Sequence, residues 1–134
     1  LCDIENNIQV GCMRFQQSIE KYNGNIYIAI QAHNYGEVMM DKALKCTADE
    51  KGIDVVELIN NYQDLSWLKY VQDIHDNPKK YLEFWQYGTY GSADYLSRIL
   101  SYCPTDKVIY QYNGNEVIFD LRYGISEIVN NKLK

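Results

Sequence analysis

The spacing of the apolar residues, which changes at Pro104, is the strongest constraint on the fold of this chain. Before Pro104 apolar residues recur every three or four positions, the spacing that places them on one face of an α-helix. After Pro104 they alternate with polar residues, and Asn113-Gly114 separates two short alternating runs. Asn-Gly between such runs is typical of a β-hairpin, because both turn residues must adopt positive φ. The sequence therefore predicts a mainly α (α+β) fold with a hairpin over residues 107–121.

Glycine, asparagine and proline divide the chain before Pro104 into helical segments. The first has one continuous apolar stripe, formed by Ile8, Cys12, Phe15, Ile19 and Tyr22. The second, which begins at Ile26 and ends at Gly36, resembles a strand by residue type. Its brevity and the small residues Ala29 and Ala32, which allow close packing, favour a buried helix. The further helices are expected at residues 37–50, 54–75, 79–87 and 92–102, with Ser92 as the cap of the last, and a helical turn or two at 125–129.

The size and composition of the chain are those of one globular domain. It has 134 residues, of which 46% are hydrophobic and 23% charged, so wholesale disorder is excluded. No apolar run approaches the ~18 residues that a membrane-spanning helix needs. The net charge of −5 and the scattered basic residues argue against nucleic-acid binding. We treat residues 1–103 as a helical domain, and residues 104–134 as a hairpin and short helix packed on it.

The cysteines and the motif content indicate neither a metal site nor a cofactor. Cys2, Cys12, Cys46 and Cys103 are widely spaced and form no Cys-x-x-Cys pair, so a zinc site is not expected. Disulfides are the less favoured alternative, and we expect Cys12 to be a small core residue of its helix. The chain also lacks the glycine-rich loops that bind phosphates. We therefore expect no cofactor.

Tyrosine is unusually frequent, with 13 residues against three of phenylalanine. Tyrosines at this density suit a sugar- or peptide-binding surface, because each offers an apolar ring and a polar tip. The alternative is that tyrosine replaces phenylalanine as core filler. We favour the alternative for most of them.

Two sequence blocks carry the only motif that points to a function. In the first, Asn7-Ile8-x-x-Gly11 opens a helix, and Ala29-Ile30-Gln31-Ala32-His33-Asn34-Tyr35-Gly36 follows after a turn. The second runs from Tyr90-Gly91-Ser92 through Tyr95-Leu96 to Leu100. Together they resemble the lysozyme-like lytic transglycosylases and muramidases of bacteria, phages and conjugative elements. The resemblance covers residues 3–36 and 88–102, and it implies a lysozyme-like helical domain that is secreted or associated with the cell envelope.

The resemblance also implies four substrate-binding residues and a partner, the glycan strands of peptidoglycan. Asn34 matches the family's Asn on the floor of the groove, Gln31 faces the same way one turn earlier, and Tyr95 matches a late tyrosine beside the catalytic carboxyl. His33 departs from the family, which has Tyr there, although an imidazole can still hydrogen-bond to a substrate. The structural alternatives are a left-handed helix end for Asn34, plain helix packing for Tyr95 and a satisfied structural group for His33.

The general acid that glycosidic cleavage requires is missing. In these families it is a Glu ahead of the Asn-Ile-x-x-Gly helix, and none of Glu5, Glu20 and Glu37 is a convincing substitute. We therefore expect the later part of a lysozyme-like domain, inactive as this chain alone, whose acid belongs to an upstream segment of the parent protein. The other hypotheses are a degenerate homologue that binds glycan or a protein partner without cutting, and a small helical interaction protein.

Overall fold

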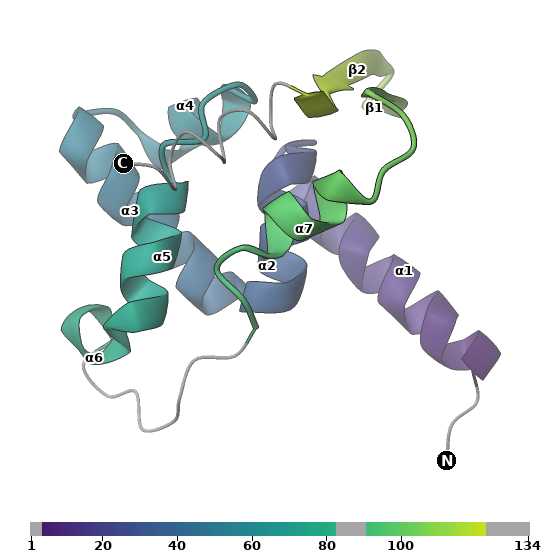
Figure 1. Ribbon diagram of the computed structural model, residues 1–134. Helices are drawn as coiled ribbons and strands as arrows, with labels where there is room; N and C mark the ends of the chain where they lie inside the picture. Colours follow the sequence, from purple (N-terminus) through teal and green to yellow (C-terminus); the bar gives the residue numbers. More distant parts are fainter. Residues whose placement is uncertain (1–3, 83–90, 123–134) are drawn as a thin grey trace.

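The computed structural model describes residues 4–82 and 91–122, and in this part of the chain it is helical apart from one antiparallel hairpin (Figure 1). The prediction of a mainly α fold with a C-terminal hairpin is confirmed. The elements are α1 (Ile4–Lys21), α2 (Ile26–Tyr35), α3 (Glu37–Lys51), α4 (Val55–Asn60), α5 (Leu68–Asp76), α6 (Pro78–Tyr81), α7 (Tyr95–Ser101), β1 (Lys107–Tyr112) and β2 (Asn115–Asp120).

Helix α2 occupies the centre of the fold and contacts α1, α3 and α7. Asn25 caps it, since its side-chain oxygen accepts a hydrogen bond from the Ile28 backbone N–H at 3.3 Å. Ala29 has no exposed surface and Ala32 almost none, so neighbouring helices approach closely. A helix that is apolar on every side is stable only when it is buried. The choice of a buried helix over a strand is confirmed.

The hairpin packs its inner face against the beginning of α2. Its strands pair in the register Val108 with Phe119 and Tyr110 with Val117, and Asn113 (φ 50°) and Gly114 (φ 78°) form the predicted turn. Phe119 is buried, with its ring in edge contact with Tyr27 at a centroid distance of 4.7 Å. The hairpin is therefore anchored in the same core as the helices.

The single helix predicted over 54–75 is wrong, because the structure has two shorter helices there, α4 and α5. The intervening turn is closed by Asp64, whose side chain accepts hydrogen bonds from the Ser66 backbone N–H at 3.0 Å and from its hydroxyl. Such a turn competes with helical hydrogen bonding. Ser92 is likewise not the cap of α7, which begins three residues later at Tyr95 with Asp94 before it.

The apolar stripe of α1 is only half buried, which corrects the prediction that Cys12 is a core residue. Phe15 and Ile19 are partly buried and Tyr22 fully, whereas Cys12 is exposed and Ile8 is 60% exposed. The first half of α1 extends beyond the other helices (Figure 1). The predicted 79–87 helix is shorter in the structure, where α6 ends at Tyr81 and Leu82 follows it outside the helix. Residues 83–87 and the turn at 125–129 fall outside the described residues.

Candidate functional site

The two sequence blocks meet in space through the side chain of Gln31. Gln31 is fully buried in α2, and its amide nitrogen donates to the Ser92 carbonyl oxygen at 2.9 Å. Its amide oxygen accepts from the Leu96 backbone N–H at 3.1 Å. The two ends of one amide thus hold the first turn of α7 and the residues just before it against α2. A buried amide must satisfy donors and acceptors together, and Gln31 satisfies both with the same segment.

Asn34 makes the second connection between the blocks, one helical turn further along α2. Its side-chain oxygen accepts a hydrogen bond from the Ser92 backbone N–H at 2.7 Å. Gly91 lies against the main-chain carbonyl of Asn34 so closely that a Cβ atom at this position would overlap it. Asn34 lies within α2 and has no positive φ, so the alternative of a left-handed helix end is wrong, and Gly36 (φ 95°) ends the helix instead.

His33 and Tyr95 line one pocket of about 210 Å³ where α1, α2 and α7 meet. Its other walls are the apolar side chains of Phe15, Ile30 and Ile99. The rings of His33 and Phe15 are 5.9 Å apart between centroids and nearly perpendicular, at 87°. His33 is exposed and Tyr95 partly buried, and the pocket that they line is largely apolar. Of the four sequence-predicted residues, the structure thus places two on the pocket and the other two behind the helix that carries Tyr95.

Phe15, Ile30 and Ile99 were not among the predicted site residues. Phe15 belongs to the α1 stripe, where helical spacing gives no sign that part of it faces a pocket. Helical spacing likewise predicts Ile30 and Ile99 to be core residues. Position within the motif was a partial signal, since Ile30 precedes Gln31 and Ile99 lies one turn beyond Tyr95.

This arrangement suits the binding of a neutral polar ligand with apolar faces. An apolar floor with a few polar groups at its rim is the usual form of a small-ligand site. The pocket residues contribute an imidazole and a phenol, which can donate or accept hydrogen bonds, and no carboxylate. The residues that line the pocket could hydrogen-bond to such a ligand, and none of them is a carboxylic acid.

The described carboxyl groups do not have the environment of a glycosidase acid. Glu5, Glu20 and Glu37 are exposed, and Glu37 forms an ion pair with Lys21 at 3.0 Å. Partial burial would raise the pKa of Asp64, but hydrogen bonds from Lys51 and Ser66 outweigh it and lower that pKa. A general acid needs a raised pKa instead.

The pKa of Asp73 is also lowered, chiefly by the hydrogen bond from the Tyr81 hydroxyl. Lys80 and Asn77 donate to the same carboxylate and lower the pKa further. This cluster joins α5 to α6, away from the pocket residues on α1, α2 and α7. Asp73 therefore has the environment of a structural carboxylate.

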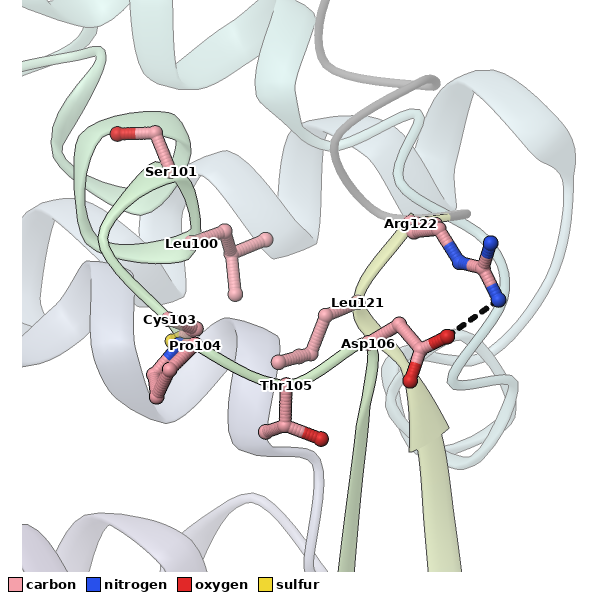
Figure 2. Close-up of a pocket in the computed structure, with 8 residues that line it drawn as sticks. All are labelled: Leu100, Ser101, Cys103, Pro104, Thr105, Asp106, Leu121 and Arg122. Carbon is pink, nitrogen blue, oxygen red and sulfur yellow. Dashed lines mark hydrogen bonds and ion pairs between the residues drawn. The ribbon is translucent and has the colours of Figure 1, made fainter.

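A larger and more open pocket, of about 560 Å³, lies at the junction of α7 and the hairpin (Figure 2). Leu100 and Leu121 form its apolar part, and the ion pair between Asp106 and Arg122 forms its polar rim. None of the sequence-predicted residues lines it. It is therefore separate from the pocket at His33 and Tyr95.

The comparisons with known proteins assign no family to the chain. No family model, no curated protein and no solved structure matches it. Across residues 4–82 and 91–122, no helix has the length and apolar character needed to cross a bilayer. The same residues contain no group of three or more His, Cys, Asp or Glu side chains placed to hold a metal ion. The described cysteines, Cys12, Cys46 and Cys103, are unpaired.

Proposed function

We propose that this chain recognises the glycan strands of peptidoglycan, as part of a lytic transglycosylase or N-acetylmuramidase. The observation that carries the proposal is the meeting of the two motif blocks, which lie some sixty residues apart in the chain: Gln31 binds Ser92 with a sequence separation of 61. His33 and Tyr95, one from each block, border the same pocket. This proximity supports the proposal, because the resemblance expects both blocks at one groove.

The pocket chemistry fits an amino-sugar unit. A sugar ring presents hydroxyls at its edge and C–H groups on its faces, so it needs hydrogen-bonding tips beside apolar surface. Tyr95 and His33 provide the tips, and Phe15, Ile30 and Ile99 provide the apolar surface. Gln31 and Asn34 act as positioning residues, since their hydrogen bonds fix α7 and with it Tyr95.

In this proposal, the chain binds the glycan strand. The general acid comes from a Glu-bearing segment that the resemblance places ahead of α1. The acid would protonate the glycosidic oxygen between N-acetylmuramic acid and N-acetylglucosamine. A lytic transglycosylase would then use the same group as a base to close an anhydro ring, and a muramidase would admit water instead. A second candidate is a non-catalytic glycan-binding or protein-binding module, which the carboxyl environments favour.

The test is sedimentation of the chain with purified, insoluble peptidoglycan. We expect the wild type to bind, and we expect His33→Ala and Tyr95→Phe each to weaken binding about three- to tenfold, the effect of losing one hydrogen bond of ~1 kcal/mol. His75→Ala and Tyr102→Phe are matched controls, because neither residue lines the pocket. No binding by the wild type, or equal binding by all five proteins, would overturn the proposal. Release of muropeptides by the full-length parent separates the enzyme from the non-catalytic module.

A further inference from the structure

A second cleft, of about 300 Å³, lies between the C-terminal half of α1 and the hairpin. One wall is formed by Gln16, Ile19 and Glu20 of α1, and the other by Tyr110 to Asn113 of β1 and its turn. The α1 wall falls within the first motif block, but the hairpin wall lies outside both blocks. None of the four sequence-predicted site residues lines this cleft.

The two walls of the cleft are fixed relative to each other by tyrosine hydroxyls. The Tyr112 hydroxyl donates to the Glu20 carbonyl oxygen at 3.3 Å, and the Tyr110 hydroxyl donates to the Gly24 carbonyl oxygen. Asn113 is held at positive φ by the two-residue turn. The cleft is therefore preformed, which removes part of the ordering cost that ligand binding would otherwise carry.

Three polar side chains at this cleft have no partner in the part of the chain that the structure describes. The side chains of Gln16, Glu20 and Asn113 make no hydrogen bond or ion pair with any residue in 4–82 or 91–122. Elsewhere the amides of Gln31 and Asn25 each form hydrogen bonds through both the nitrogen and the oxygen. Free amides on both sides of a preformed cleft can therefore hydrogen-bond to a ligand.

The chemistry of these groups selects a neutral ligand rich in hydroxyl and acetamido groups. A primary amide both donates and accepts, the Glu20 carboxylate accepts from hydroxyls, and a tyrosine ring packs on C–H groups. An anion would be repelled by the Glu20 carboxylate, and the described residues that line the cleft include no cation to balance it. A saccharide satisfies all of these groups at once.

We infer that the cleft between α1 and the hairpin is a second glycan subsite, next to the pocket at His33 and Tyr95. This inference rests on the proposed function and extends it to longer strands. Phe15 borders the first pocket and Ile19 borders the cleft, and these residues are one turn apart on α1. Four residues span roughly 6 Å along a helix axis, so one linear strand can contact both sites.

The experiment measures affinity for peptidoglycan glycan strands that have been freed of peptides and separated into a disaccharide pool and a long pool. The test variant is Gln16→Ala with Asn113→Gly, in which glycine keeps the positive φ of the turn. We expect the wild type to bind long strands about tenfold more tightly than disaccharide, because the second contact is intramolecular. The variant should lose this gain and bind disaccharide within twofold of the wild type.

The matched control is Gln17→Ala with Asn115→Ala, which removes two neighbouring exposed amides that do not line the cleft. It should bind both pools as the wild type does. If the test variant keeps the wild-type preference for long strands, or loses affinity for both pools equally, the second subsite is overturned while the proposed function stands. If the wild type binds neither pool, the proposed function fails, and this inference fails with it.

Discussion

Tyrosine hydroxyls join the elements of this protein to one another. The hydroxyls that donate to backbone carbonyls of other elements or turns are those of Tyr27, Tyr35, Tyr62, Tyr110 and Tyr112. Tyr22 donates instead to the Asp41 carboxylate at 2.9 Å. Phenylalanine could fill the same apolar space but could not make these bonds, so tyrosine here is more than the core filler that composition favoured.

Replacing Tyr35 by phenylalanine tests this role where the contact is deepest. Tyr35 is 1% exposed, and its hydroxyl donates to the Val71 carbonyl oxygen at 2.8 Å, joining α2 to α5. We expect Tyr35→Phe to lower the free energy of unfolding by about 1–2 kcal/mol, the usual cost of losing a buried hydrogen bond. Urea denaturation measures this. Tyr102→Phe, at a residue 82% exposed, should change stability by less than about 0.5 kcal/mol.

At the scale of elements, the sequence predicted those whose ends carry strong local signals. The hairpin was found because Asn113-Gly114 fixes both turn and register, and α2 and α3 because Gly36 and Gly52 end them. The division between α4 and α5 was missed, since the apolar spacing continues through a turn that Asp64 closes with its side chain. The exposed start of α1 was missed because periodicity identifies the apolar face of a helix. It does not show how far a neighbouring helix extends along that face.

The candidate site was predictable only in part. The motif named Gln31, His33, Asn34 and Tyr95, but it could not separate residues that border a pocket from residues that position α7. That distinction depends on burial, which sequence spacing alone does not give: Gln31 is fully buried and His33 exposed. The cleft at the hairpin could not be predicted, because it arises from the packing of α1 against a distant strand.

A glycine pair tests whether the contact between α2 and the start of α7 holds this part of the fold together. Gly91 (φ 73°) and Gly52 (φ 68°) both adopt left-handed conformations, and a Cβ at Gly52 would meet nothing within 4 Å. Gly52→Ala should therefore cost only the backbone strain, ~1 kcal/mol. Gly91→Ala would in addition overlap the Asn34 carbonyl and should cost at least about 1–3 kcal/mol more. Thermal unfolding compares them, and equal costs would contradict the contact.

On the scale of the whole molecule, the buried tyrosines make stability depend on alkaline pH. Burial raises the pKa of Tyr22, Tyr35 and Tyr110 above the usual range, and for Tyr22 the nearby Asp41 carboxylate adds to it. Above pH ~10 the unfolded chain loses these phenolic protons while the folded chain keeps them. The folded state then binds more protons, so stability falls as pH rises.

We expect the free energy of unfolding to be unaffected by these tyrosines below pH ~10 and to fall above it, by about 1 kcal/mol per pH unit for each fully buried residue. Denaturation at several pH values, followed together with tyrosinate absorbance, measures this. Tyr35→Phe should reduce the slope above pH 10. A stability that is flat through this range would contradict the raised pKa values.

The bonds from Tyr110 and Tyr112 to the turn between α1 and α2 also bear on how such a protein can evolve. The carbonyl groups of Glu20, in the last turn of α1, and of Gly24, in the turn that follows, accept hydrogen bonds from residues with sequence separations of 92 and 86. Deletion of the hairpin would expose the end of α1. It would also expose the ring of Tyr27, which packs against Phe119. Loss or exchange of this C-terminal piece would therefore require compensating changes near the N-terminus, and the two regions should vary together among any descendants.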